Sequence, residues 1–180
     1  MTAQRKDIFF FDNGEYSLVG TSNSFGISPM QYGITPRHIE TSCWRGYWNE
    51  YGLQNSQVVL KNIYVNSSRN GYPKIAGKRP LLFFRKDGYH KYANINITLE
   101  YTGKLLIARK YLWKYRHDMG IDEPWEYEEL IKLDFKNGIL CSVTNCNNIA
   151  RRTREYLTDN PRKRYLLFKY KFLKQLYDSG

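Results

Sequence analysis

The sequence predicts an α+β, strand-rich fold: an antiparallel twisted sheet or partial barrel of about seven to ten strands, with a C-terminal amphipathic helix. Short apolar runs alternate with turn dipeptides such as Asn-Gly and Asp-Gly, and no helical periods lie between them. Aromatic residues make up 16% of the chain, and large rings suit strands. A sustained helical period occurs only near the C-terminus.

One domain is the natural size for this chain of 180 residues, which can bury about 70% of the surface that it exposes when unfolded. The apolar fraction of 42% and the charged fraction of 25% are those of ordinary globular proteins. We therefore expect a single domain over residues 1–180. It has a β-rich body over residues 1–148 and a basic helical segment over residues 149–180.

The expected strands follow from apolar alternation and from the turns that bound them. They lie at residues 7–11, 15–19, 45–51, 57–65, 81–85, 94–101, 127–135 and 139–144. Residues 20–40 contain Gly, Ser, Pro and Asn without a sustained period, so we expect a long loop there with one short helical turn.

The clearest alternation lies at residues 94–101, where apolar and polar residues alternate throughout. Thr102-Gly103 follows directly and suits a two-residue loop. A hairpin closed by this loop sets Leu99 opposite Leu106, which gives the hairpin one apolar face.

A second hairpin is expected at Asn137-Gly138, because both residues accept positive φ angles. The two-residue loop sets Phe135 opposite Leu140 and Lys136 opposite Ile139. This pairing joins two of the expected strands.

Residues 161–177 are expected to form the C-terminal helix, because apolar residues recur there at helical spacing. One stripe consists of Tyr165, Phe168, Phe172 and Leu176. Pro161 suits the first turn of this helix. A shorter helix is expected at residues 149–157.

The formal net charge is +11, and residues 151–180 hold nine Lys and Arg against three Asp and Glu. Such a cluster favours nucleic acid or other anionic partners. The candidate nucleic-acid-binding residues are Arg151, Arg152, Arg154, Arg162, Lys163, Arg164, Lys169 and Lys171. Two alternatives stay open, since such side chains also line the exposed side of a helix packed on a sheet or attach a helix to an anionic membrane surface.

Four aromatic residues stand beside an arginine and a glycine in one short stretch. On a strand, Trp44 and Trp48 share one face, which we expect to be buried. Arg45, Tyr47 and Tyr51 share the other face, and we predict that they bind a protein partner. The alternative is a structural arginine that stacks on a tyrosine and pairs with a carboxylate.

Residues 43–51, with their Trp-Arg-Gly-Tyr core, and the strand-like residues 58–63 resemble a family of uncharacterised bacterial proteins. Residues 101–107, His117-Asp118-Met119-Gly120 and Lys136-Asn137-Gly138 are also similar to that family. The resemblance covers residues 40–145 in patches. It implies a β-rich fold and assigns no activity and no catalytic residue.

The three cysteines offer no complete catalytic or metal-binding motif. Cys43 precedes a tryptophan, as in some cysteine proteases, but no histidine has a matching flanking sequence, so we expect a buried thiol. Cys141, Cys146 and His117 fall short of the four ligands of a structural zinc site. We therefore expect no catalytic residue, no metal and no cofactor.

A carboxylate cluster precedes one expected strand and consists of Glu123, Glu126, Glu128 and Glu129. Such clusters are more typical of solvated or ion-paired groups than of an acid–base pair. The thiols and the absence of a signal-peptide pattern favour the cytoplasm, and no apolar run is long enough to span a bilayer.

The sequence thus predicts a small, non-catalytic cytoplasmic module that acts through a protein partner, in a bacterial conflict, immunity or accessory role. The alternative is a nucleic-acid-binding accessory protein that uses the basic C-terminal helix and exposed aromatic residues. An enzyme is the third reading.

Overall fold

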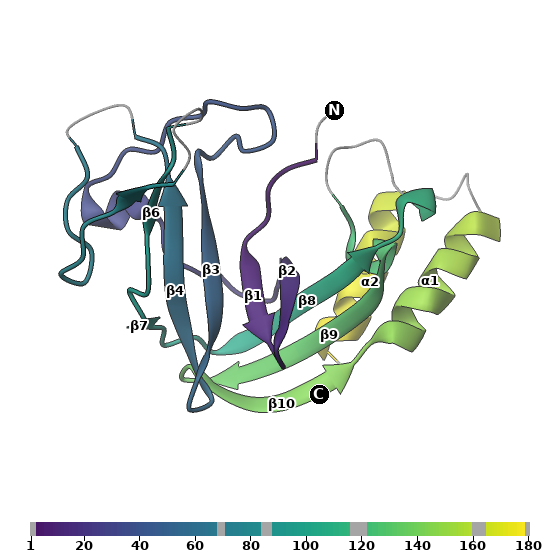
Figure 1. The fold of residues 1–180 in the computed structure, drawn as a ribbon. Helices are drawn as coiled ribbons and strands as arrows, with labels where there is room; N and C mark the ends of the chain where they lie inside the picture. Colours follow the sequence, from purple (N-terminus) through teal and green to yellow (C-terminus); the bar gives the residue numbers. More distant parts are fainter. Residues whose placement is uncertain (1–2, 68–70, 84–87, 116–121, 160–164, 179–180) are drawn as a thin grey trace.

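The computed structural model describes residues 3–67, 71–83, 88–115, 122–159 and 165–178 (Figure 1). The strands in this part are β1 (Ile8–Phe11), β2 (Gly14–Thr21), β3 (Tyr47–Gln54), β4 (Gln57–Val65), β5 (Leu81–Leu82), β6 (His90–Tyr92), β7 (Ile97–Thr98), β8 (Gly103–Tyr111), β9 (Tyr127–Lys136) and β10 (Ile139–Asn145). The helices are η1 (Pro29–Tyr32), η2 (Trp113–Tyr115), η3 (Pro124–Glu126), α1 (Asn147–Asp159) and α2 (Tyr165–Asp178). The predicted strand-rich α+β class is confirmed.

The strands form one mixed sheet in the order β10-β9-β8-β2-β1-β3-β4-β6-β5, with β7 beside β4. Ile139 of β10 also pairs with Gln57 of β4, which closes the strands from β10 to β4 into a ring. Within the described residues, β1 and β3 are the one parallel pair. β6 and β5 lie outside the ring, and β5 is the last strand at this end of the sheet within the described ranges.

The hairpin at Asn137-Gly138 is confirmed. Leu140 lies opposite Phe135 and Ile139 lies opposite Lys136. The turn residues have φ angles of 50° and 80°, as a two-residue loop requires.

The expected hairpin at Thr102-Gly103 is wrong. β7 pairs with β4, with Ile97 opposite Leu60, and β8 lies between β2 and β9. Leu106 therefore does not lie opposite Leu99. Alternation indicates which side chains share a face, but it does not indicate which strand lies alongside.

The two α-helices cover the β8–β9 part of the sheet (Figure 1). Phe172 and Leu176 of α2 are buried there, and the ring centroid of Phe172 lies 4.9 Å from that of Trp125. The predicted stripe is confirmed for these two residues, while the side chains of Tyr165 and Phe168 lie outside the described residues. In the part of the chain that the structure describes, no helix is long and apolar enough to cross a membrane.

The observed strand ends differ from the predicted ones at two places that matter for the site. β4 has the predicted bounds, but β3 begins at Tyr47, two residues later than expected. β5 is limited to Leu81–Leu82, and residues 84–85 of that expected strand lie outside the described ranges. The expected loop at residues 20–40 contains the short helix η1.

Candidate functional site

Arg45 lies in a turn before β3, because Gly46 has a φ of 70° and cannot continue a strand backwards. Its guanidinium forms two hydrogen bonds with Asp7, Nη2 to Oδ1 at 2.5 Å and Nη1 to Oδ2 at 3.3 Å. The guanidinium carbon also lies 4.9 Å from the ring centroid of Tyr47. Burial raises the pKa of the Asp7 carboxyl, and the charge of Arg45 opposes that rise. These contacts match the alternative of a structural arginine.

Tyr51 cannot belong to a partner-binding surface, because its exposed fraction is 0%. Its hydroxyl accepts a hydrogen bond from Nδ2 of Asn49 at 2.8 Å, and its ring packs 4.8 Å from that of Phe25. Burial raises the pKa of the Tyr51 phenol. Tyr47 and Tyr51 share a face as predicted, but that face points into the main core.

The two tryptophans of the same stretch have different environments. Trp48 is buried as predicted, whereas Trp44 is 68% exposed and corrects the prediction that it shares the buried face. Trp44 precedes the strand, so strand alternation does not apply to it. Cys43 is buried, as expected for a packed thiol, and its Sγ lies 3.5 Å from the carbonyl oxygen of Tyr47.

Arg154 is the one predicted nucleic-acid-binding residue that the structure rules out. It is buried, and its Nη1 donates hydrogen bonds of 2.7 Å to the carbonyl oxygens of Trp125 and Tyr127. It therefore fastens α1 to the end of η3 and the start of β9. The helical periodicity of α1 places Arg154 on the side of the helix that packs against η3 and β9.

The other predicted basic residues are only partly placed. Arg151, Arg152 and Lys171 are exposed, and Arg151 pairs with Glu155 at 3.0 Å. Three further residues and one further side chain lie outside the described residues: Arg162, Lys163, Arg164 and the side chain of Lys169. The described part of the helices thus carries a modest basic surface.

The carboxylate cluster is structural. Glu123 and Glu126 are buried and form a reciprocal cap at the start of η3. Glu129 pairs with Arg109 and Lys110, and these cations lower the pKa of its carboxyl. Among the described residues, no group of three His, Cys, Asp or Glu side chains could hold a metal ion, and His117 lies outside them.

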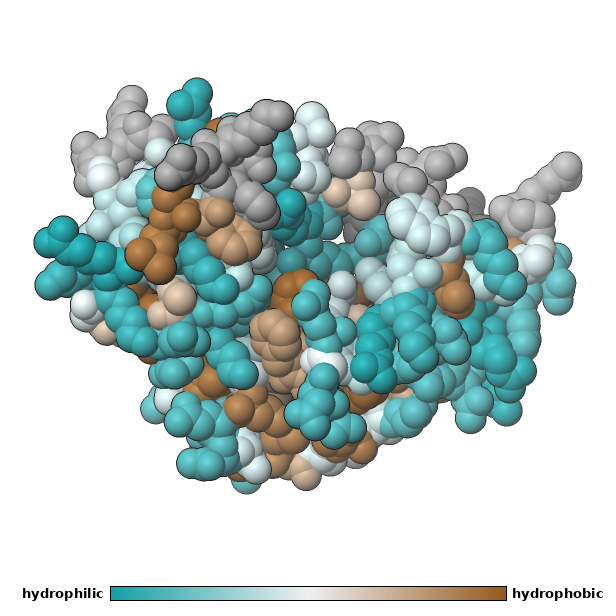
Figure 2. Space-filling view, viewed as in Figure 1, coloured by the Kyte–Doolittle hydropathy of each residue, from teal (hydrophilic) through white to brown (hydrophobic). Residues whose placement is uncertain are grey.

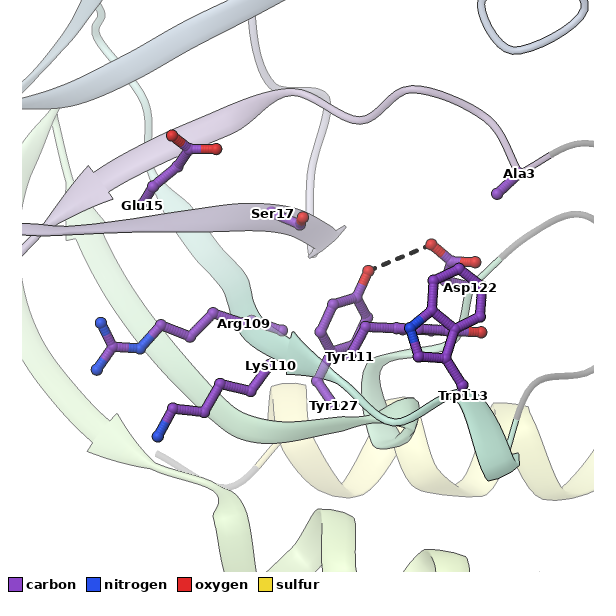
Figure 3. A pocket seen from close by; sticks show the side chains of 10 residues that line it. Ala3, Glu15, Ser17, Arg109, Lys110, Tyr111, Trp113, Asp122 and Tyr127 are labelled. Carbon is purple, nitrogen blue, oxygen red and sulfur yellow. Dashed lines mark hydrogen bonds between the residues drawn. The ribbon is translucent and has the colours of Figure 1, made fainter.

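A hollow of about 350 Å³ lies between β2, β8 and the chain around Asp122 (Figure 3). Lys6 reaches into this region and donates to Asp122 at 2.7 Å and to the hydroxyl of Tyr127 at 3.2 Å. Burial lowers the pKa of the Lys6 ammonium, and the bond to Asp122 opposes this. The hydroxyl of Tyr111 donates to Glu126 at 3.0 Å.

Arg109 and Lys110 extend to the same side of that hollow, although neighbours on a strand normally point to opposite faces (Figure 3). The cause is the φ angle of 62° at Lys110, which bends β8. Both cations then contact Glu129. Asp122, Arg109 and Lys110 at this hollow are thus each paired with a charged side chain of the same chain.

The free end of the sheet has a different character. One row of paired residues crosses four strands: Trp48 on β3 lies opposite Tyr64 on β4, Tyr64 opposite Lys91 on β6, and Lys91 opposite Leu81 on β5. The rings of Trp48 and Tyr64 are stacked, with centroids 4.6 Å apart and planes 7° apart. Burial raises the pKa of the Tyr64 phenol. This row begins in a packed cluster and ends at the sheet edge.

The edge itself is apolar and exposed. Leu81 is 70% exposed, Leu82 is 50% exposed and Phe83 is 42% exposed. Figure 2 shows apolar residues beside hydrophilic ones at the β6 end of the molecule. Leu81 and Leu82 lie on opposite faces of the sheet, because successive strand residues alternate.

At Leu82, the backbone N–H and C=O groups point away from β6. The N–H of Phe83 donates to the carbonyl of Tyr89 at 2.9 Å, so Phe83 faces β6. In an antiparallel pair the next residue along faces away, so the N–H and C=O of Leu82 point to the open edge. Pro80 adds an outward carbonyl but has no N–H. The edge therefore offers one complete backbone pair, that of Leu82, flanked by the exposed side chains of Leu81 and Phe83.

Sequence reasoning treated residues 81–85 as an ordinary strand and missed this site. The available signal was four consecutive apolar residues after a proline, a pattern without the polar alternation of a half-buried strand. What the sequence could not show was that, among the described strands, β5 pairs only with β6.

No protein-family model, curated protein or solved structure matches this chain. The resemblance to a bacterial family therefore stays a prediction.

Proposed function

We propose that this protein is a non-catalytic cytoplasmic binding module that holds an extended segment of a partner protein against the β5 edge. The observation that carries the proposal is the exposure of Leu81 and Leu82 on β5, and of Phe83 directly after it, where the outer side of β5 has no neighbouring strand within the described residues. Exposed sheet edges with apolar side chains pair readily with a further strand.

Side-chain burial and backbone pairing both support this mode of binding. A partner strand beside β5 would receive the N–H and C=O of Leu82 and would cover the side chains of Leu81 and Leu82. Full burial of a completely exposed leucine contributes about 1.5–3 kcal/mol, and Leu81 and Leu82, which are 70% and 50% exposed, would each contribute a part of that. Because Pro80 removes one donor, the contact is short, which suits a regulated or transient partner.

The rest of the sheet supports the edge as a rigid platform. Trp48 and Tyr64 anchor the row that ends at Leu81, and Arg5 stacks on Trp48 with 4.1 Å between its guanidinium carbon and the ring centroid. Arg45 and Tyr47 contribute by holding the N-terminal segment against β3 rather than by touching the partner. A rigid platform lowers the entropy cost of binding.

A matched pair of variants tests the proposal. Leu82 and Val143 are both 50% exposed and both lie on strands, Val143 on β10 away from β5. We expect Leu82→Asp to abolish affinity capture of a partner from nuclease-treated cell extract, while Val143→Asp retains the same partner. In the complex, hydrogen exchange of the Leu82 amide should slow. Equal effects of both variants, with circular dichroism showing that both are folded, would overturn the proposal.

Nucleic-acid binding is the second candidate, favoured by the exposed Arg151, Arg152 and Lys171 on the C-terminal helices. It predicts retention on heparin and an affinity for DNA or RNA that falls steeply with salt. Arg152→Glu should weaken such binding at every sequence tested. An affinity that does not change with salt would exclude this candidate.

A further inference from the structure

We infer that the segment bound at the β5 edge is acidic: an extended stretch in which Asp or Glu alternates with apolar residues. This inference rests on the proposed function, because it names the chemistry of the segment that the same edge receives. It follows from where the excess positive charge of the chain lies.

The excess charge is concentrated in two stretches. Residues 71–98, which contain β5 and β6, hold six Lys and Arg and one Asp, and residues 151–180 hold nine Lys and Arg and three Asp and Glu. Without these two stretches the chain holds thirteen residues of each sign. Residues 71–98 thus account for nearly half of the net charge of +11.

Two described cations of the first stretch, Lys91 and Arg79, lie next to β5 in space or in sequence. Lys91 pairs with Leu81 across the β5–β6 ladder, and its Nζ lies 4.8 Å from the ring centroid of Tyr64 and 5.7 Å from that of Phe83. Arg79 is exposed and lies two residues before Leu81 in the sequence. The ammonium of Lys91 is therefore held beside the apolar side chains that a partner strand would cover.

These cations have no carboxylate partner within the described residues. Residues 71–83 and 88–98 contain no Asp or Glu, and no ion pair involves Lys74, Lys78, Arg79 or Lys91 there. The ammonium of Lys78 donates to the carbonyl oxygen of Asn94 instead. Glu50 on β3 accepts a hydrogen bond from Nδ2 of Asn62 at 2.5 Å, so this carboxylate is already engaged.

Charge and apolar surface together select a protein segment over nucleic acid. A phosphate backbone would neutralise Lys91 and Arg79, but it offers no backbone N–H for the outward carbonyl of Leu82 and no apolar group for its side chain. An acidic extended peptide supplies all three. Opposite charge also speeds encounter and rejects basic segments, which gives the short edge its selectivity.

Synthetic peptides test the inference with the full chain. Three labelled peptides of about eight residues carry Val at alternate positions and Glu, Gln or Lys at the others. In fluorescence anisotropy we expect the Glu peptide to bind about tenfold more tightly than the Gln peptide at low salt, and to lose that advantage well above about 0.15 M salt. The Lys peptide should not bind.

A charge reversal provides the control. Lys91→Glu should remove the preference for the Glu peptide and create one for the Lys peptide, while Lys136→Glu, an exposed cation at the β9–β10 turn, should change neither. Arg79→Glu, at an exposed position outside the strands, provides the same reversal if Lys91→Glu fails to fold.

The outcomes separate the inference from the proposed function. If the Glu and Gln peptides bind equally and both shift the amide resonance of Leu82, strand capture stands and the acidic preference is overturned. If no peptide shifts that resonance, the inference and the proposed function both fail. If an oligonucleotide shifts it while the peptides do not, the edge binds nucleic acid and the inference is wrong.

Discussion

Arg45 and Asp7 join the N-terminal segment to the start of β3 through two hydrogen bonds, the shorter 2.5 Å long. The same Oδ1 of Asp7 accepts the N–H of Asn49 at 2.7 Å. The carbonyl oxygen of Asp7 accepts the N–H of Leu18 on β2. One aspartate thus ties together β1, β2 and β3, where the parallel pair of the sheet begins.

Replacing Asp7 should be costly. We expect Asp7→Asn to lower the free energy of unfolding by about 1–3 kcal/mol, because the Asp7 carboxylate is only 12% exposed and accepts hydrogen bonds from both Arg45 and the N–H of Asn49. Urea unfolding followed by circular dichroism measures the change. Glu40→Gln is the control: Glu40 pairs with Arg5 at 3.6 Å and both side chains are about a third exposed, so its loss should stay below about 1 kcal/mol. Equal losses would show that the Asp7 pair has no special role.

Substitutions at two glycines with similar backbone angles distinguish the cost of backbone strain from the cost of steric crowding. Gly46 and Gly33 have φ angles of 70° and 75°, so an added Cβ strains either one by about 1–2 kcal/mol. At Gly46 the new Cβ would also lie 2.5 Å from the carbonyl oxygen of Arg37, whereas at Gly33 nothing lies within 4 Å. We expect Gly46→Ala to lower the melting temperature by clearly more than Gly33→Ala. A smaller loss for Gly46→Ala would mean that the chain at Arg37 moves freely.

The buried guanidinium of Arg154 should matter for stability and not for binding of anions. Arg154→Met removes two hydrogen bonds to backbone carbonyls and should cost about 2–3 kcal/mol in chemical unfolding. Arg152→Met, on the exposed side of the same helix, should cost less than about 0.5 kcal/mol. On a heparin column the order should reverse, with the Arg152 variant eluting earlier. Earlier elution of the folded Arg154 variant alone would contradict this assignment.

Alkaline pH should destabilise the fold through buried phenols. Burial raises the pKa of Tyr92 to about 12, and its hydroxyl donates to the carbonyl oxygen of Pro73 at 2.7 Å. Because the folded-state pKa lies above the unfolded value of about 10, the folded state binds the proton more tightly. The stability is therefore complete below pH about 10 and is lost as the pH rises towards about 12.

Tyr92→Phe checks this pH dependence. The variant should lose about 1 kcal/mol near neutral pH for the missing hydrogen bond, and its stability should fall less steeply between pH about 10 and 12. Unfolding free energies across that range, with tyrosine ionisation followed by ultraviolet absorbance, measure both effects. If stability falls equally steeply with pH in the variant and in the unchanged protein, ionisation of Tyr92 does not contribute to the loss of stability at alkaline pH.

Local patterns predicted much of the fold. The strand at residues 57–65 and the pairing of Phe135 with Leu140 follow from alternation and from a turn that accepts positive φ angles, and both are observed. The pairing of β7 with β4 was not predictable in this way, because β7 reaches its partner across a turn of the chain that no local signal marks.

The candidate site was predicted less well. The stretch from Cys43 to Tyr51 does contain a buried thiol and a buried Trp48. The face that carries Tyr47 and Tyr51, however, packs into the main core enclosed by the strands and does not face a partner. The exposed edge lies at Leu81 and Leu82, which sequence reasoning treated as an ordinary strand. A strand has two faces, and the alternation of its residues does not indicate which face another layer of the protein will cover.

The sequence by itself determined the strand-rich class, most strand positions, the amphipathic C-terminal helix and the excess of positive charge, because each depends on residues near one another in the chain. Only the tertiary structure decided that Tyr51 and Arg154 are buried and that Leu81 is exposed, and it also placed β5 at the end of the sheet. Those facts depend on which strands become neighbours. Neighbours are chosen by the packing of distant segments around shared cores, and no local pattern records that choice.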